Sequence, residues 1–326
     1  MHQQSGTRYE DTITLIISPL ETIECDLDGG KTIVIDGATG TELERRGAAM
    51  HDKAWCAMAT LTDPGLLCAV HEDYIRAGAR VVIANTFSTN RNMLEPAGLE
   101  LRFEELNRRA VELARQARSR TGTAGRVAVA GSISHQVPVV GGADQRDVHA
   151  VPRPEIAAAN FREMAELLAA SGVDLILMEM MSDPQLANPA IAAAVATGLP
   201  VWVGFSVRAG ESGELTAYAL PEMGAAEMLD MISLDGVRVA GVMHSNVDTI
   251  APMIELLKRR WSGPLMAYPD SGYFKMPHWQ FVDIIPADDF VARNLEWVAA
   301  GVQIVGGCCG LGVEHIEALA ASLSSP

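Results

Sequence analysis

The stretch GVQIVGGCCG, residues 301–310, joins an apolar run to two adjacent cysteines flanked by glycines. Residues 302–305 are rich in valine and isoleucine and predict a buried strand. The glycines that follow allow the backbone to turn so that both sulfurs can face one point. Adjacent thiolates are soft ligands that suit zinc, whereas free cysteines elsewhere often pack as small apolar side chains. A metal site here therefore needs further ligands from the rest of the chain.

Seven other short runs resemble residues 302–305, because β-branched and other apolar residues dominate them. Near-continuous Val, Ile and Leu is typical of parallel strands that are buried on both faces. Stretches with helical spacing lie between the runs, and several have proline in the first turn, where a missing N–H costs little. The expected strands are residues 32–35, 80–84, 127–130, 174–178, 201–205, 237–243, 264–268 and 302–305. The expected helices are residues 64–77, 99–118, 154–170, 184–196, 221–232, 249–260, 287–300 and 313–323.

Eight strands, each followed by a helix, predict an α/β fold of the (β/α)8 TIM-barrel type. We expect a single barrel domain over residues 31–326, preceded by an N-terminal extension over residues 1–30. The alternative is a doubly wound open sheet, which normally carries a glycine-rich phosphate loop after its first strand. The stretch DGATG at residues 36–40 does not match the G-x-G-x-x-G pattern of such a loop.

The composition bounds the partners of this domain. The 326 residues are 48% hydrophobic and carry a net charge of −16, which argues against nucleic acid and anionic membranes as partners. No apolar stretch approaches the roughly 20 residues that span a bilayer, and the run at residues 13–20 lacks the basic flank of a signal peptide. Five cysteines, two of them adjacent, do not resemble a disulfide framework, so we expect a reducing, cytoplasmic setting.

Polar and metal-capable residues follow the expected strands. In a barrel of this kind the active site lies at the carboxyl ends of the strands. The placement of these residues therefore supports a metal site that includes the two adjacent cysteines. The residues at the strand ends are Asp36-Gly37, Asn85-Thr86, Glu179, Met243-His244-Ser245-Asn246, Tyr268-Pro269-Asp270 and Gly307-Cys308-Cys309.

Five features together resemble the homocysteine S-methyltransferase family. They are IDGATGTELERRG (35–47), HEDYIRAGARVVIANTF (71–87), the strand end at Glu179, AYPDSG (267–272) and GVQIVGGCCG (301–310). The resemblance runs from about residue 32 to residue 320. It implies a zinc-dependent (β/α)8 barrel, in agreement with the strand count, and an enzyme that methylates a thiol. Zinc would hold the substrate sulfur as a thiolate at neutral pH, and this thiolate would attack a methyl group on a positively charged sulfur or nitrogen.

The resemblance also assigns roles to residues at the strand ends. Two carboxylates, Asp36 and Glu179, would hold the ammonium group of the substrate, and the backbone amides just after Asp36 would take its carboxylate. Asn85 would line the pocket. Taken alone, Asp36 could instead be a turn former before glycine, and Asn85 a strand-end cap. The expected substrate-binding residues are Asp36, Gly37, Thr39, Asn85, Glu179 and Tyr268.

The chain departs from the family at the sixth expected strand. The family takes its third zinc ligand from a stretch close to Gly-Val-Asn-Cys, but residues 241–246 read GVMHSN and place His244 at the cysteine position. In one interpretation His244, Cys308 and Cys309 are catalytic metal ligands for Zn²⁺, a Cys₂His set with an open fourth position. Replacing a thiolate by a neutral imidazole makes the site less negative by one charge and the bound sulfur less electron-rich. In the other interpretation zinc is lost and His244 is a general base or a polar contact.

The 326 residues leave room for the barrel only, so we expect no separate folate or cobalamin domain. We therefore expect a small onium methyl donor such as S-methylmethionine, S-adenosylmethionine, glycine betaine or dimethylsulfoniopropionate. Aromatic faces attract such cations. The loop at residues 273–279 carries aromatics beside Lys275 and His278 and is a candidate lid or specificity loop. The aromatic candidates are Trp55, Phe87, Tyr268, Tyr273, Phe274 and Trp279.

Three functions follow from these patterns. The first is a zinc-dependent S-methyltransferase of methionine biosynthesis that moves a methyl group from a small onium donor to homocysteine or a related thiol. The second is a divergent enzyme on the same scaffold, with another acceptor or a demethylase role, and either with or without zinc. The third is a ligand-binding barrel without catalysis. The expected partners are the small-molecule thiol and the onium donor, with no nucleic acid and no membrane, and a homodimer is left open.

Overall fold

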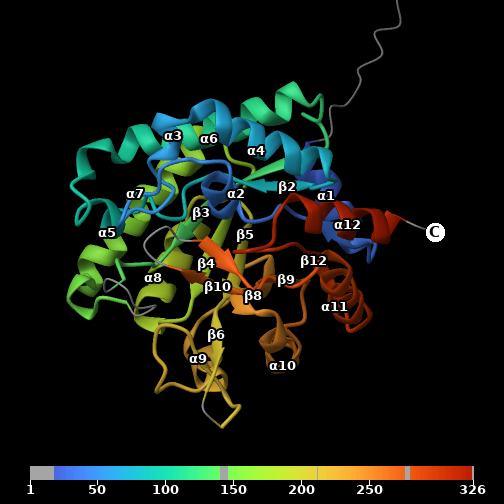
Figure 1. Ribbon diagram of the computed structural model, residues 1–326. Helices are drawn as coiled ribbons and strands as arrows, with labels where there is room; N and C mark the ends of the chain where they lie inside the picture. Colours follow the sequence, from blue (N-terminus) through green and yellow to red (C-terminus); the bar gives the residue numbers. More distant parts are fainter. Residues whose placement is uncertain (1–17, 140–145, 211, 276–279, 325–326) are drawn as a thin grey trace, which may run out of the picture.

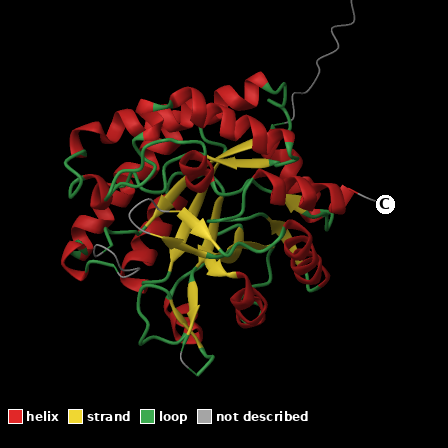
Figure 2. Cartoon of the chain, viewed as in Figure 1, coloured by secondary structure: helices red, strands yellow, loops and turns green. Residues whose placement is uncertain are grey.

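Eight parallel strands enclose a packed interior, and helices cover their outer side (Figure 1; Figure 2). The computed structural model describes residues 18–139, 146–210, 212–275 and 280–324. The strand order is β1-β12-β9-β8-β5-β4-β3-β2, and a parallel bridge between Ile35 and Val81 brings the two ends of this sheet together. The predicted (β/α)8 barrel is therefore confirmed. The doubly wound open sheet is excluded, since its edge strands would stay apart.

The elements follow the predicted order, with ends that differ by a few residues. The barrel strands are β1 (Ile33–Val34), β2 (Val81–Ile83), β3 (Ala128–Ser134), β4 (Leu175–Met181), β5 (Val201–Phe205), β8 (Val239–Asn246), β9 (Leu265–Asp270) and β12 (Val302–Val305). The helices around them are α2 (Thr39–Arg45), α4 (Pro64–Arg76), α6 (Phe103–Arg120), α7 (Pro154–Ser171), α8 (Pro184–Val195), α9 (Ala225–Met231), α10 (Val247–Leu257), α11 (Ala287–Ala299) and α12 (Val313–Ser324). Short helical turns are α3 (Ala59–Thr62), α5 (Arg91–Leu94), η1 (Glu100–Arg102) and η2 (Val148–Ala150).

Successive residues of each strand face opposite sides, as the pleat requires. In the first strand and its extension, Ile33 and Ile35 pack inside the barrel, whereas Val34 packs against the helices. Larger side chains also fill the interior, among them Trp202 of β5 and Met243 of β8, both fully buried. Gly204 makes room for Met243, because a Cβ at this glycine would lie 2.3 Å from the Met243 Sδ. The barrel is therefore a filled core, and only the carboxyl ends of its strands are left to bind small molecules.

The predicted N-terminal extension contains helix α1 (Pro19–Asp28), which begins with a capping box between Ser18 and Glu21. Its apolar face covers the amino ends of the strands: Ile23 and Leu27 are buried in the same cluster as the barrel interior. The Gln303 side chain of β12 also donates a hydrogen bond to the Leu27 carbonyl, at 2.8 Å. Helix α1 thus closes the barrel at the end opposite the strand-end residues. The domain boundary at residues 30 and 31 stays a prediction.

Two β-hairpins that the sequence analysis did not predict extend from the carboxyl ends of the barrel. The first, β6 (Val207–Ala209) with β7 (Leu215–Ala217), lies between β5 and α9. The second, β10 (Tyr273–Lys275) with β11 (Gln280–Val282), lies between β9 and α11. Figure 1 shows the first hairpin reaching outward beside α9. Among the described residues, no helix has both the length and the apolar character required to cross a bilayer.

Candidate active site

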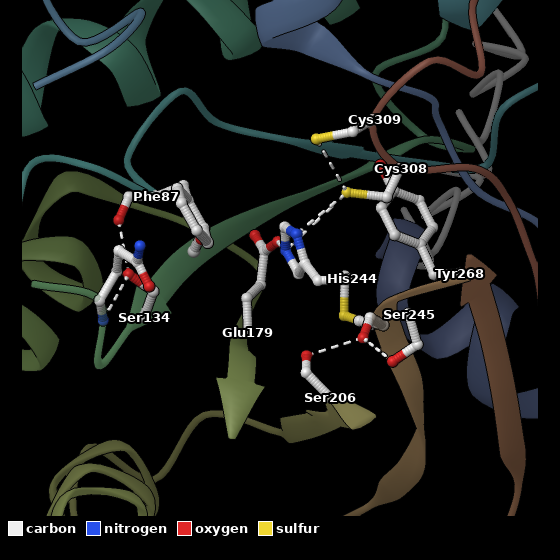
Figure 3. Close-up of polar contacts among 12 residues, drawn as sticks. Phe87, Ser134, Glu179, Ser206, His244, Ser245, Tyr268, Cys308 and Cys309 are labelled. Atoms are coloured by element: carbon white, nitrogen blue, oxygen red, sulfur yellow. Dashed lines mark hydrogen bonds and ion pairs between the residues drawn. The ribbon is translucent and has the colours of Figure 1, made fainter. Parts of the chain in front are cut away.

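The structure brings the three predicted metal ligands together. His244 lies near the carboxyl end of β8, and Cys308 and Cys309 follow β12, the neighbour of β9 in the sheet. One potential ligand atom from each residue lies within 4.8 Å of the others. The two Sγ atoms are 3.8 Å apart, and the Cys308 Sγ is 3.2 Å from His244 Nδ1 (Figure 3). Residues separated by more than 60 positions in the sequence thus form one compact group of two sulfurs and one nitrogen.

The backbone around the cysteines explains why glycines flank them. A Cβ at Gly306 would lie 2.6 Å from the Ile35 side chain and 2.8 Å from the Asp36 carbonyl, so this residue must be glycine for β12 to pass β1. Gly310 has φ +84°, a conformation that glycine adopts without strain. Between them the Cys308 N–H donates to the Pro269 carbonyl at 2.6 Å, and the Ser271 N–H donates to the Cys309 carbonyl at 3.0 Å. The double-cysteine turn is therefore anchored to the end of β9.

The imidazole of His244 has a partner on each nitrogen. Its Nε2 is 2.7 Å from the Glu179 Oε2, while its Nδ1 faces Cys308. The ring of Phe87 stacks on the imidazole, with centroids 4.9 Å apart and an interplanar angle of 29°. Figure 3 shows Glu179, His244 and Cys308 in a line that runs from the end of β4 to the end of β12. Glu179, Cys308 and Phe87 therefore contact the Nε2 edge, the Nδ1 edge and one face of the imidazole, respectively.

Both polar members of this line sit at irregular strand ends. His244 has φ +44°, and the register of β8 with β9 shifts between Met243 and Asn246. Met180, just after Glu179, has φ +59°, within a similar shift of β4 against β5. Bulges of this kind re-aim side chains next to active sites, and a left-handed residue other than glycine costs on the order of 1 kcal/mol. The two hydroxyls of Ser206 and Ser245 donate to the Met243 carbonyl at 2.7 and 2.8 Å and stabilise the β8 bulge.

The protonation of this cluster follows from its burial and its neighbours. Burial by itself lowers the pKa of His244, but Cys309 and the Glu179 carboxylate outweigh burial and raise that pKa to about 10. Hydrogen bonds from the Cys308 thiol and from His244 lower the pKa of Cys309 to about 6, although burial alone would raise it. Burial and the neighbouring Cys309 raise the pKa of Cys308 well above its usual range. At neutral pH the metal-free cluster therefore pairs the Cys309 thiolate with the His244 imidazolium, and its protons leave when a metal binds.

The donor set fits a zinc ion. Two sulfurs bound to one zinc at about 2.3 Å with tetrahedral geometry lie about 3.8 Å apart, which is the 3.8 Å separation of Cys308 and Cys309. A hydrogen-bonded carboxylate on the far nitrogen of a ligating histidine is the usual arrangement at zinc sites, and Glu179 supplies it here. Cys56 and Cys68 are buried in the outer core and are outside the three-residue group.

Asp36, just after β1, and Tyr268 of β9 are both buried at the carboxyl ends of their strands. Asp36 is fully buried; one oxygen accepts the Ile83 N–H at 2.7 Å, and the other is 3.4 Å from the Tyr268 hydroxyl. The Tyr268 hydroxyl also donates to the Gly37 carbonyl at 3.2 Å. Burial, opposed by the Ile83 N–H and reinforced by the Glu179 carboxylate, raises the pKa of Asp36 well above its usual range. A cationic group beside Asp36 would restore its charge.

The remaining predicted substrate residues face protein groups. The Asn85 amide donates to the Cys56 carbonyl at 3.0 Å and to the Thr60 hydroxyl at 3.2 Å, so it ties the segment after α2 to the end of β2. Gly37 is buried, and Thr39 begins the seven-residue helix α2. The backbone N–H of Ala38, between these two residues, already donates to the Leu311 carbonyl at 3.0 Å. The structure thus places Glu179 against His244 and Asp36 against Tyr268, whereas Asn85 makes a structural contact.

A cavity of about 650 Å³ opens above the cluster, with His244 and Cys309 in its wall. Among the predicted aromatics, Trp55, Phe87 and Tyr273 line it, whereas Tyr268 is buried inside the barrel. Trp279 and His278 lie outside the described residues. The two hairpins add Tyr218, Phe281 and the Arg208 guanidinium, which lies 3.7 Å from the centre of the Tyr218 ring. These last three were not predicted, although Gly210 and Gly213 mark the turn of the first hairpin.

Comparisons with known proteins agree with this geometry. The family model described as homocysteine S-methyltransferase matches residues 33–323. Homocysteine S-methyltransferase 4 from Zea mays is 30% identical over 90% of each chain, and selenocysteine methyltransferase from Astragalus bisulcatus is 29% identical over 91% of this chain and 94% of its own. The crystal structure of the homocysteine methyltransferase MmuM from Escherichia coli in its metallated form superposes with a TM-score of 0.72. It is 26% identical and covers 94% of this chain and all of its own.

Proposed function

Because the chain belongs to the homocysteine S-methyltransferase family, we propose that this methyltransferase moves a methyl group from a small onium donor to homocysteine or a related thiol at a zinc site. The ligands of this site are His244, Cys308 and Cys309. One observation carries the proposal: a two-sulfur, one-nitrogen cluster with zinc-like spacing lies at the wall of an aromatic cavity. A bound zinc ion would keep the sulfur of the acceptor as a thiolate.

The acceptor is held beside the cluster by groups of the barrel mouth. Asp36 is the proposed partner of its ammonium group, since a buried carboxylate with a raised pKa gains most from a cation. The backbone amides of Gly37 and Thr39, on either side of the engaged Ala38 amide, are the proposed partners of its carboxylate. These contacts fix the direction in which the acceptor sulfur points. Alignment of this kind supplies most of the acceleration in an in-line displacement.

The donor occupies the aromatic cavity. Trp55, Phe87 and Tyr273 offer ring faces to a sulfonium or quaternary ammonium group, each worth on the order of 0.5–2 kcal/mol. Arg208, in the same wall, can pair with a carboxylate of the donor. A donor that carries both an onium group and a carboxylate matches this wall, which favours the S-methylmethionine and betaine types. The aromatic walls also exclude water from the onium group, so the methyl group passes to the thiolate.

Methyl transfer is tested with the purified protein, homocysteine and each donor in turn, by mass spectrometry of the methylated product. We expect methionine with a carboxylate-bearing onium donor, loss of turnover after zinc is removed by a chelator, and recovery when zinc is returned. Selenocysteine belongs in the acceptor panel because of the Astragalus relative. No methylated product with any donor would contradict the proposal. Donor demethylation without a thiol would favour the demethylase alternative, and full activity without zinc would exclude the metal.

The same chemistry requires free thiols. Cys308 and Cys309 are free in the structure, as are Cys25, Cys56 and Cys68. We therefore also propose a reducing, cytoplasmic setting for the enzyme, in which vicinal thiols stay available to a metal. Oxidation of the pair would remove two of three ligands, so zinc content is expected to fall after treatment with a disulfide-forming oxidant.

A further inference from the structure

We propose that Glu179 is a positioning residue for His244: it accepts the Nε2–H of the imidazole and so presents Nδ1 as the atom that binds the metal. The inference rests on the zinc site of the proposed function. The resemblance to the family gives Glu179 a different role, as a partner of the substrate ammonium group. The geometry points to a new role because this chain has a histidine where the family has a cysteine.

The distances separate the two nitrogens. Glu179 Oε2 lies 2.7 Å from Nε2 of His244, a charge-assisted hydrogen-bond distance. The Cys308 Sγ lies 3.2 Å from Nδ1 and 3.9 Å from Nε2. A neutral imidazole has one donor and one acceptor nitrogen, and the carboxylate can only accept. The proton of a metal-bound His244 therefore belongs on Nε2, and the lone pair on Nδ1 faces the sulfurs.

A stacked neighbour and the local backbone conformation also restrict rotation of the imidazole ring. Phe87 covers one face of the imidazole at 4.9 Å between centroids. The backbone of His244, at φ +44° within the β8 bulge, sets the direction of its Cα–Cβ bond. Glu179 is 4% exposed and His244 is 9% exposed, so water has little access to the hydrogen bond between them. Of these constraints, Glu179 alone distinguishes one ring nitrogen from the other.

The arrangement also compensates for the missing thiolate. A histidine in place of a cysteine removes one negative charge from the atoms around the metal. The Glu179 carboxylate returns that charge at the far nitrogen, where it makes the imidazole a more basic ligand. A consequence is that the substrate ammonium group is left to Asp36, which has no contact with His244 and is bonded to Ile83 and Tyr268 instead. In the family pattern both carboxylates bind the substrate ammonium group. In this chain Asp36 keeps that role, and Glu179 orients His244 instead.

The test compares Glu179→Ala and Glu179→Gln with the control Asp36→Asn in the full-length protein. Zinc affinity is measured by competition with a chromophoric chelator, and the ring nitrogens of His244 are assigned by ¹⁵N NMR of the zinc-loaded form. We expect zinc on Nδ1 and a proton on Nε2 in the wild type. Glu179→Ala should weaken zinc binding by about 10- to 100-fold. Glu179→Gln, whose amide oxygen still accepts from Nε2–H, should lose less, and Asp36→Asn should stay within about threefold of the wild type, since its side chain does not contact the ligands.

Zinc bound to Nε2, or Glu179→Ala affinity equal to that of Asp36→Asn, would overturn the inference. If Glu179→Ala does not fold, the wild-type ¹⁵N assignment and the Glu179→Gln affinity decide. Thiol methylation is measured separately in the wild type. Glu179-dependent zinc binding without methyl transfer would refute the proposed function and leave this inference intact. Methyl transfer together with a zinc affinity that is independent of Glu179 would support the proposed function and refute this inference.

Discussion

Phe87 stacks on His244 with ring centroids 4.9 Å apart and an angle of 29° between the rings. Phe87 also makes an edge contact with Trp55 at 6.3 Å, and both aromatics line the cavity. One phenyl ring thus joins the proposed donor wall to the proposed metal ligand. A change in this ring is expected to affect both parts of the site.

Phe87→Leu keeps an apolar side chain but removes the ring face. We expect the KM of the onium donor to rise by roughly 3- to 30-fold, from the loss of one cation–π contact worth about 0.5–2 kcal/mol. Zinc affinity should also fall, because the imidazole loses its stacked neighbour. Phe281→Leu, on the cavity wall in β11, is the matched control and should raise the donor KM without weakening zinc. Steady-state kinetics measure the donor KM, and chelator competition measures the zinc affinity. An unchanged zinc affinity in Phe87→Leu would show that the phenyl ring does not contribute to metal binding.

His244→Cys restores the sulfur ligand found in the family pattern. The bound thiol should become more electron-rich, so the kcat of homocysteine methylation is expected to rise by at least about threefold, or ~0.7 kcal/mol in the barrier. His244→Ala is the control and should lose zinc and activity together. Stopped-assay kinetics with zinc analysis of each protein provide the measurement. Zinc-replete His244→Ala with wild-type turnover would show that His244 is not a ligand.

Arg208→Met removes the guanidinium that lies over Tyr218 but keeps much of the side-chain length. The KM of a donor with a carboxylate should rise by about tenfold, which corresponds to ~1.4 kcal/mol of charge-assisted pairing. A trimethylsulfonium donor has no carboxylate and serves as the matched ligand, with an expected KM change of less than about twofold. Equal increases for both donors would indicate that Arg208 shapes the wall without reading a carboxylate.

Ile23→Ala tests whether helix α1 belongs to the folded barrel. The Ile23 side chain is fully buried in the interior cluster, so its truncation should lower the free energy of unfolding by about 2–5 kcal/mol. Cys25→Ala, on the exposed side of the same helix, should change stability by less than about 0.5 kcal/mol. Urea unfolding monitored by circular dichroism gives both values. A negligible loss in Ile23→Ala would place α1 outside the cooperative unit.

His71 links stability to pH. Its side chain is fully buried in α4, and neither ring nitrogen has a hydrogen-bond partner within the part of the chain that the structure describes. Burial lowers its pKa from 6.5 to about 4. The unfolded state therefore binds the proton first, and stability that is complete above about pH 6.5 is lost as the pH falls toward 4, by ~3 kcal/mol.

His71→Leu should remove this part of the acid sensitivity, although His135, whose pKa burial also lowers to about 4, keeps a part of its own. Urea midpoints at pH 7.5 and pH 4.5 provide the comparison between His71→Leu and the wild type. If the two proteins lose the same stability over this interval, the protonation of His71 does not contribute.

The barrel itself was predictable from local pattern. Each strand from residues 32–35 to 302–305 is a short, mainly apolar run bounded by polar residues, glycine or proline, as is typical of strands buried on both faces. The strand ends were therefore known within a few residues, and Cys308, Cys309 and His244 could be assigned to one rim of the barrel. The hairpins were not predictable in this way, because β6 and β10 are only three residues long and rest on the rim rather than in the core.

The amino-acid sequence by itself determined the fold, the family and the presence of a histidine at a metal-ligand position, since these depend on residue type and order along the chain. Only the tertiary structure decided which nitrogen of His244 faces the sulfurs, and that Glu179 rather than solvent holds the other. It also directed the Asn85 amide to a structural contact, although that residue follows a strand just as Glu179 does. The reason is that a side chain's partners depend on bulges, register and the approach of distant segments, and none of these is encoded in the local spacing of residues.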